Sequence, residues 1–535
     1  MTRRSSTWKT VSVGISLVLA LSACAGGGED GSTGKDKKSG GGGFSFAVGE
    51  PDHLTPGRSQ VAMDQMHAMF APLVRIDDKG ELSYVQAQSV TSSDSVHWTV
   101  KLRAGWTFHN GEPVTAQSYA DAWNHAAYAP NAWANNGQLA GIAGYEALNP
   151  AKGKPKTKTL SGVRVVDGTT LEVTLSTPDS QFPVQLTADQ GAFYPMPKAA
   201  FKDLKAYDKN PIGNGPFRMN SAWETGKGAT VTAYQGYKGT KPAASEITFK
   251  AYKDMQTAYT DALAGNTDIV AVPASKLGNA KADFGKRLHT YDAPALEFLG
   301  LPLYDKRYQD VRLRKALSRA IDRTAVNKAM YGGLYSPATS FTPASEVGAP
   351  TGICDDCVYD PAAAKRLLAE AGGWSGPMEL WYPGGLGLDE LYKAVANQLR
   401  QNLGIEGAKP RPTADWAEYS DALYGKKVTG PHFGHWGALY PSMQNTLRAI
   451  FTEKGGCYVC SYYSHPEVDA LLLKADSEPD QSASQELYVD AQKRILADFP
   501  VIPLFYGAYV YATSDRVSGV KISQSNVELD RVTVR

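Results

Sequence analysis

Two histidines in the segment HFGHWGALYPSMQN, residues 432–445, are the first candidates for chemistry in this sequence. His432 and His435 stand three positions apart, which is compatible with half of a metal site. If residues 431–436 form a strand, side chains three positions apart point to opposite faces and cannot share one metal ion. The rest of the segment is mainly aromatic and aliphatic, which suits the wall of a ligand pocket, and it contains no acidic residue.

The cysteines are the second candidates. Four of the five form two Cys-x-x-Cys pairs, Cys354 with Cys357 and Cys457 with Cys460. This spacing is compatible with structural disulfides, with zinc or with redox chemistry. The two pairs are far apart in the sequence, unlike the ligands of a compact zinc ribbon, and two aspartates inside the first pair oppose a reactive thiolate. Disulfides are therefore preferred, closed either within each pair or between the pairs.

The fifth cysteine, Cys24, ends an export signal. Residues 1–10 are basic and residues 11–21 are apolar, but the apolar run is shorter than the roughly 20 residues of a membrane-spanning helix. Residues 21–24 (Leu-Ser-Ala-Cys) resemble the lipobox of bacterial lipoproteins, in which the cysteine is lipidated. The Gly/Ser/Lys-rich residues up to 43 then form a flexible tether. We expect an extracytoplasmic protein, lipid-anchored to the outer face of the cytoplasmic membrane, in an oxidising compartment that favours disulfides.

Length and charge set further bounds. The chain has 535 residues, 42% of them hydrophobic, which is enough for several domains with large cores. There are 55 basic and 54 acidic residues, so the net charge is +1. This balance gives no indication that the protein binds nucleic acid or an anionic membrane surface.

The elements that must position these residues alternate between strand and helix patterns, which predicts a mixed α/β protein. Strands are expected over residues 44–49, 96–105 and 170–177, a pair of buried strands over 501–514, and helices over 63–74, 115–128, 311–322 and 360–373. Thr115 is expected to cap one helix. Asp360, Pro361 and Gly372 mark both ends of another.

Seven segments, in order along the chain, carry a resemblance to a known family. They are EPDHLTP (50–56), FAPLVRIDDKGEL (70–82), HWTVKLRAGWTFHNGEPVTAQSYADAW (97–123), GNGPFRM (213–219), DVRLRKALSRAIDR (310–323), YDPAAAKRLLAEAG (359–372) and YSHPEVDALL (463–472). With them the chain resembles the extracytoplasmic solute-binding proteins of dipeptide and oligopeptide ABC importers, over nearly everything after the tether. In that family the third segment is architectural, so His109 and Glu112 are expected to have no catalytic role.

The resemblance implies a periplasmic-binding-protein-like type II fold, with two hinged lobes and an extra domain in the first. Carried onto this chain, residues 1–23 are the signal peptide and 24–43 the lipidated cysteine and tether. Residues 44–76, 210–297 and 506–535 form lobe I, residues 77–209 its extra domain, and residues 298–505 lobe II. The ligand is expected between the lobes, which close around it.

The resemblance also implies ligand-binding residues. They are Glu50 in the entry motif, Trp416 after Asp415, and Trp436, Leu439 and Tyr440 in a motif similar to Trp-x-Ala-Asp-Tyr. Leu439 stands where the family has the aspartate that pairs with a peptide's ammonium group. An unpaired buried ammonium costs several kcal/mol. Three interpretations stay open: the amine is held elsewhere, for instance by Glu50 or Asp415; the ligand is blocked at its N-terminus; or it is another solute.

The predicted function is therefore a lipid-anchored receptor that captures a peptide or peptide-like ligand and delivers it to ABC permease subunits. The alternatives are the same role for a non-peptide solute such as an oligosaccharide or small metabolite, a peptide-sensing receptor, and, remotely, a zinc enzyme. No nucleophile-elbow or His-Glu-x-x-His motif is present in the sequence, so we expect no enzyme, no cofactor and no bound metal. We expect a monomer that contacts the membrane only through its lipid and binds no nucleic acid.

Overall fold

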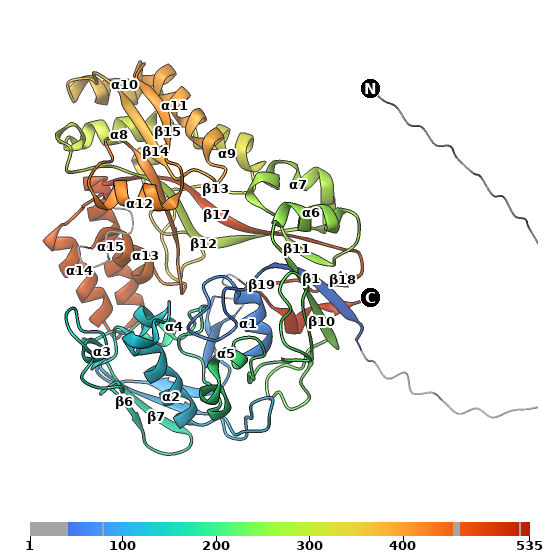
Figure 1. Ribbon diagram of the computed structural model, residues 1–535. Coiled ribbons are helices and arrows are strands. Elements are labelled where there is room, and N and C mark those ends of the chain that lie inside the picture. The colour runs from blue at the N-terminus through green and yellow to red at the C-terminus, as the bar shows by residue number, and fades with distance from the viewer. Residues whose placement is uncertain (1–40, 78–79, 453–460, 524–525) are drawn as a thin grey trace, which may run out of the picture. The chain divides into compact units, whose positions relative to one another are not determined.

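The computed structural model describes residues 41–535 except 78–79, 453–460 and 524–525, and one 11-stranded sheet runs through them. Its strand order is β15-β14-β16-β12-β17-β11-β1-β10-β9-β8, with β13 paired to β17 outside this path. Figure 1 shows β12 and β17 in the middle of the molecule, between the helices α8–α15 and the segments around α6 and β1.

One end of this sheet is built on the predicted first strand. β1 (Gly43–Gly49) runs parallel to β10 (Glu246–Tyr252) and β11 (Ile269–Ala271), with Phe46 opposite Phe249 and Ile269. β9 (Gly228–Ala233) and β8 (Phe217–Met219) continue the sheet with antiparallel pairing. Helices α6 (Met255–Leu263) and α7 (Leu277–Phe284) flank this end.

The predicted pair of strands over residues 501–514 is wrong, because the segment forms a single strand, β17 (Val501–Thr513). At 13 residues it is longer than the five or six of a usual strand. It stays continuous because it hydrogen-bonds along its length to β11, β12 (Leu288–Gly300) and β13 (Ser336–Pro337). The register with β12 shifts twice, once between Asp292 and Leu296 and again between Glu297 and Phe298.

The other end of the sheet contains β16 (His432–Gly437), β14 (Met378–Tyr382) and β15 (Ala408–Pro412). The helices that accompany it are α8 (Val311–Arg319), α9 (Arg323–Tyr331), α10 (Pro361–Glu370), α11 (Asp389–Leu403) and α12 (Trp416–Tyr424). The predicted caps of α10 are confirmed: the Asp360 side chain accepts from Ala363 N, Pro361 opens the helix, and Gly372 follows it with a positive φ of 90°. Three further helices follow in the chain, α13 (Met443–Phe451), α14 (Pro466–Ser477) and α15 (Gln481–Asp498).

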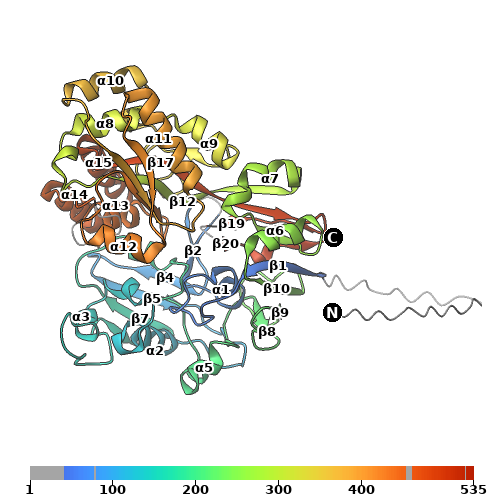
Figure 2. The ribbon, with the colours of Figure 1, turned by 45° about the horizontal axis from the view of Figure 1, so that its top comes forward.

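A separate four-stranded antiparallel sheet has the order β4-β5-β7-β6. Its strands are β4 (Ala87–Thr91), β5 (His97–Leu102), β6 (Val163–Val165) and β7 (Thr170–Thr174). Helix α2 (Ala116–Ala127) packs beside it, and Figure 2 shows β4, β5 and β7 stacked next to this helix. The predicted cap is confirmed, because Thr115 and Ser118 form a reciprocal capping box.

The helix expected over residues 63–74 is shorter than predicted. α1 (Met63–Met69) ends before Phe70, which is extended, and Val74 already begins β2 (Val74–Ile76). Pro72 explains the early end, because a proline disfavours helical geometry in the residue before it. β2 pairs with β3 (Leu82–Tyr84), and the other short elements are α3 (Tyr145–Leu148), α4 (Phe182–Gln185), α5 (Leu204–Tyr207), β18 (Val517–Ser518), β19 (Ile522–Ser523), β20 (Asn526–Val527) and β21 (Thr533–Val534).

Two large hydrophobic clusters form the interior. One contains residues of α1, α2 and the four-stranded sheet together with β1, and the other contains residues of α8–α11 and α13–α15. The strands of the large sheet contribute to both clusters, so this sheet is the element that joins them.

Candidate functional site

A cavity of ≈310 Å³ lies where the segment after β16 meets the segment before α4. Leu439 and Tyr440 contribute to its wall from the first segment, Asp179 contributes from the second, and Gln185 contributes from α4. The volume is at the lower end of the range of about 300–1,000 Å³ that is usual for small-molecule sites. The cavity therefore brings two of the predicted ligand-binding residues together with side chains from a distant part of the sequence.

The loop that carries Leu439 is held in place by one amide side chain. Asn445 accepts through Oδ1 from the Leu439 backbone N–H and from Trp436 Nε1, both at 3.1 Å. Ser442 caps α13, because its side chain accepts from Gln444 N. These contacts fix how the three predicted residues of this motif are placed: Leu439 and Tyr440 line the cavity, and Trp436 lies behind them, hydrogen-bonded to Asn445.

Gln444 is the centre of the polar wall and is only 2% exposed. Its Nε2 donates to Asp179 Oδ1 and to Asp476 Oδ1, both at 2.9 Å. Its Oε1 accepts from Gln185 Nε2 at 3.0 Å and from the Tyr440 hydroxyl at 2.9 Å. One buried amide thus satisfies two carboxylates and two donors, and it ties α13 to the segment around α4.

The same two parts of the chain are joined by further hydrogen bonds. Ser180 N donates to the Asp476 carbonyl at 2.7 Å, and Ser442 Oγ donates to Gln181 Oε1 at 2.9 Å. Gln481 Nε2 donates to the Ser180 carbonyl at 3.4 Å. The contact beside the cavity is therefore a polar network and not an apolar interface.

The two acids of the cavity have different partners. Asp476 pairs with Arg448 and accepts from the Tyr488 hydroxyl. Among the described residues, the hydrogen-bond donors to Asp179 are neutral, namely Gln181 N at 2.9 Å, Gln185 Nε2 at 2.7 Å and Gln444 Nε2. Burial raises the pKa of Asp179, and hydrogen bonds from these donors act against that rise.

Burial also sets the protonation of the neighbouring phenols. It raises the pKa of Tyr440 and of Tyr488 far above their ordinary value, and the charge of Asp179 raises both further. Both hydroxyls therefore stay protonated and act as hydrogen-bond donors at neutral pH.

Glu50 and Trp416 do not line this cavity. The Glu50 carboxylate accepts from Trp223 Nε1 at 3.0 Å and from the Gly226 backbone N–H. Trp416, 45% exposed, opens α12 and contacts the rings of Tyr419 and Phe433. A ligand restricted to the cavity would therefore touch neither residue.

The two histidines lie on β16, as the strand hypothesis requires. His432 is fully buried with Nδ1 3.2 Å from the Gly430 carbonyl oxygen, whereas His435 stands opposite Glu297 of β12. They are three positions apart on one strand and so face opposite sides of the sheet. Within residues 41–535, leaving aside the short undescribed gaps, no three His, Cys, Asp or Glu side chains are placed to share a metal ion.

Glu297 is a further acid that the sequence reasoning did not single out. Its Oε2 accepts from the Tyr331 hydroxyl at 3.0 Å, and burial raises its pKa to about 7. No strand was expected over residues 288–300, so nothing in the sequence indicated the position or the burial of Glu297.

His109 has the structural role that was expected of its segment. Its Nδ1 accepts from Gly213 N at 3.2 Å, so its Nε2–H donates to the Gly215 carbonyl at 3.1 Å. Burial lowers its pKa to about 4, which keeps the ring neutral. Two of the family-like segments, 97–123 and 213–219, are therefore joined by this side chain. Glu112 accepts from Asn110 and Lys198 N in the adjoining loop.

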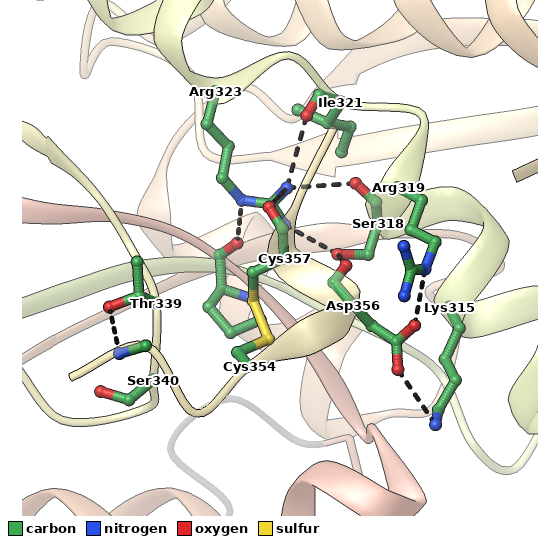
Figure 3. Close-up of a disulfide and its surroundings, with 12 residues drawn as sticks. Lys315, Ser318, Arg319, Ile321, Arg323, Thr339, Ser340, Cys354, Asp356 and Cys357 are labelled. Atoms are coloured by element: carbon green, nitrogen blue, oxygen red, sulfur yellow. Dashed lines mark hydrogen bonds and ion pairs between the residues drawn. A yellow bond between two sulfur atoms is a disulfide. The ribbon is translucent and has the colours of Figure 1, made fainter. Parts of the chain in front are cut away.

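Cys354 and Cys357 form a disulfide, which resolves how this pair closes. Figure 3 shows Arg323 donating to carbonyl oxygens beside it, among them that of Cys357 at 2.9 Å, while Asp356 pairs with Arg319 and Lys315. The disulfide thus closes a short loop on itself, and Lys315, Arg319 and Arg323 connect this loop to α8 and α9. Cys24, Cys457 and Cys460 lie outside the described residues.

Sequence reasoning missed the polar wall of the cavity. Asp179, Gln444, Arg448 and Asp476 come from three separate segments, and only Gln444 and Arg448 have a spacing, one helical turn, that indicates a shared face.

Among the helices of the described residues, none is long and apolar enough to cross a bilayer.

Comparisons with known proteins agree with this architecture. A family model described as bacterial extracellular solute-binding proteins, family 5 Middle, matches residues 81–456. The oligopeptide-binding protein OppA of Bacillus subtilis is 26% identical over 538 residues, covering 96% of each chain. The probable deoxycholate-binding periplasmic protein YgiS of Escherichia coli is 26% identical over 86% of each chain. The solved structure of the periplasmic murein tripeptide binding protein MppA, in an unliganded open form, superimposes with a TM-score of 0.78 at 23% identity, covering 92% of this chain and 97% of that one. The predicted mixed α/β fold is confirmed, and the structure shows an additional antiparallel sheet.

Proposed function

Because this chain belongs to the family 5 bacterial extracellular solute-binding proteins, we propose that it captures a peptide or peptide-like ligand between two lobes and delivers it to an ABC import permease. The protein is an extracytoplasmic binding receptor of an ABC importer and not an enzyme. The observation that carries the peptide proposal is the cavity lined by Leu439 and Tyr440, because these residues belong to the motif expected to face the ligand.

The lobes of this proposal follow the boundaries expected from the sequence. Residues 44–76, 210–297 and 506–535 form lobe I, residues 77–209 its extra domain, and residues 298–505 lobe II. Strands β12 and β17 cross the boundary, and the register shifts between them near Asp292 and Glu297 are the proposed hinge. A ligand that contacts Asp179 of the extra domain and Tyr440 of lobe II would favour the closed arrangement of the lobes.

The remaining predicted residues complete the proposal. Glu50 and Trp416 contact the part of a ligand that extends beyond the cavity, where the exposed indole of Trp416 offers a stacking surface. Cys24 carries the lipid anchor, and the residues up to 43 form the tether that keeps the receptor near its permease. Cys457 and Cys460, which lie outside the described residues, are proposed to be oxidised in a disulfide, as the sequence predicts.

Native mass spectrometry of protein purified from its own host tests the ligand class directly. A co-purified mass that fragments as a peptide supports the proposal. A mass that fragments as a sugar, a sterol-like acid or another metabolite contradicts it. Isothermal titration with tripeptides is the second measurement, and micromolar or tighter binding is expected.

One observation favours a second candidate, a non-peptide solute. Leu439 occupies the position at which a carboxylate would pair with a peptide amine, so the motif itself contains no acid. The relative YgiS is named for binding deoxycholate, a ligand without an amine. The same mass-spectrometric experiment distinguishes the two candidates.

A further inference from the structure

We propose that the cavity beside Leu439 is a subsite for a primary ammonium group and that Asp179 is the residue that binds it. This inference rests on the proposed function and adds to it the chemical class of the ligand's buried end. The subsite takes its acid from the segment before α4 and not from the segment after β16.

The charges on the cavity wall do not balance. Three charged side chains line it, Asp179, Arg448 and Asp476. Arg448 forms an ion pair with Asp476, and its charge also acts on Asp179, so the cavity holds one excess negative charge when Asp179 is ionised. Among the described residues Asp179 forms no ion pair, and its hydrogen-bond donors are a backbone amide and two glutamine side chains. A ligand with one positive charge would supply an ion-pair partner for this carboxylate.

The hydrogen-bonding capacity of Asp179 leaves room for that partner. Oδ1 accepts from Gln181 N and Gln444 Nε2, whereas Oδ2 accepts from Gln185 Nε2. A carboxylate oxygen can accept two hydrogen bonds, so Oδ2 retains one free position. Phe193 and Tyr440 also line the cavity, and aromatic rings favour a nearby cation.

The other two acids considered for binding an amine, Glu50 and Asp415, already accept hydrogen bonds from other groups. The Glu50 carboxylate accepts from Trp223 and Gly226, and Asp415 caps α12 by accepting from Glu418 N at 3.0 Å. Neither lines the cavity. Leu439 does line the cavity, and so does Asp179. The cavity therefore lacks an acid at the motif position but has one on its opposite wall.

Isothermal titration at pH 7 with tri-alanine, N-acetyl-tri-alanine and putrescine tests the subsite. Acetylation removes the charge of the peptide amine, and putrescine carries primary ammonium groups without a peptide. The variants are Asp179→Asn, which keeps the size of the side chain, and Asp179→Glu, which keeps its charge. The control is Asp203→Asn, which removes the same charge from an exposed carboxylate that also serves at a helix N-terminus, outside the cavity.

Wild-type protein is expected to bind tri-alanine about 10- to 100-fold more tightly than its acetylated form, as a hydrogen bond between charged groups predicts. Asp179→Asn should abolish this preference while leaving the affinity for the acetylated peptide within about twofold. Asp179→Glu and Asp203→Asn should retain it. Equal loss of affinity for both peptides in Asp179→Asn would assign this residue a merely structural role and overturn the inference.

The remaining outcomes separate the inference from the proposed function. Tight binding of both peptides without preference overturns the ammonium subsite and leaves the peptide receptor standing. Binding of putrescine but of neither peptide, lost in Asp179→Asn, supports the subsite and overturns the peptide ligand. Absence of binding by all three probes overturns both.

Discussion

Gln444→Leu is the most direct test of the polar network around the cavity. The substitution removes an amide that donates to Asp179 and Asp476 and accepts from Gln185 and Tyr440, all within 3.0 Å. Each hydrogen bond to a carboxylate contributes about 1.5–3 kcal/mol, and those between neutral groups contribute about 1 kcal/mol. The leucine side chain recovers part of this by burying apolar surface. We therefore expect the free energy of unfolding to fall by about 3–5 kcal/mol at pH 7.5.

Urea denaturation followed by tryptophan fluorescence measures this loss. The matched control is Gln492→Leu in α15, because Gln492 is also fully buried but its amide contacts only Thr342 Oγ1 and the Met443 sulfur. The control should cost about 1 kcal/mol. The difference between the two variants isolates the contribution of the carboxylates, since both replace a buried glutamine with the same residue.

The pH dependence of the same difference provides a second check. Removing the Gln444 donor raises the pKa of Asp179 further, because this hydrogen bond opposes the rise caused by burial, so the native variant binds more protons than the native wild type. The stability lost in Gln444→Leu should therefore grow as pH rises from 5 to 8. A cost for Gln444→Leu that equals that of Gln492→Leu, or that does not change with pH, would refute this account of the network.

Three further predictions concern other parts of the molecule. Leu439→Asp should increase the affinity for tri-alanine about tenfold relative to N-acetyl-tri-alanine in isothermal titration, because it places a second carboxylate in the cavity; an equal change for both peptides would contradict this. Asp189 is 8% exposed and burial raises its pKa from 3.8 to about 7, so the native state holds its proton where the unfolded state has lost it. The free energy of unfolding of the wild type should accordingly decline between pH 4 and pH 7, with this group contributing up to about 4 kcal/mol. Asp189→Asn should remove this contribution when urea denaturation is measured at the two pH values. An unchanged pH dependence would exclude Asp189 as its source. Cys354→Ser with Cys357→Ser opens a short loop and should cost about 2 kcal/mol in the same assay, and dithiothreitol should destabilise the wild type by about this amount more than it destabilises the variant.

Local structure followed from the sequence wherever short-range chemistry decides it. The caps at Thr115 and Asp360 are predicted because a side chain and a backbone amide three residues later satisfy each other without help from the rest of the chain. The strand expected over residues 44–49 is present, with Phe44, Phe46, Ala47 and Val48 buried. The prediction of two strands over residues 501–514 was wrong because the partners of that segment are far away in sequence. Pairing with β11, β12 and β13 keeps the segment as one strand.

The residues of the candidate site also differ in whether the sequence could predict them. Leu439 and Tyr440 were predicted because they belong to one contiguous motif. Asp179 lies 265 positions before Gln444, and no periodicity or spacing relates the two. The cysteine pair was predicted, but its local closure needed the positions of Cys354 and Cys357 in space. Sequence patterns therefore do not predict contacts between residues that are brought together only by the tertiary fold.

The central position of β17 has a consequence for how the chain becomes folded. In the strand order β17 lies between β12 and β11, yet it comprises residues 501–513 of 535. While the chain is being synthesised, both of these strands present unpaired edges, which are prone to association with other chains. The large sheet can be completed only after nearly the whole polypeptide has emerged. A protein truncated before residue 501 would therefore be left with two open strand edges and a tendency to aggregate.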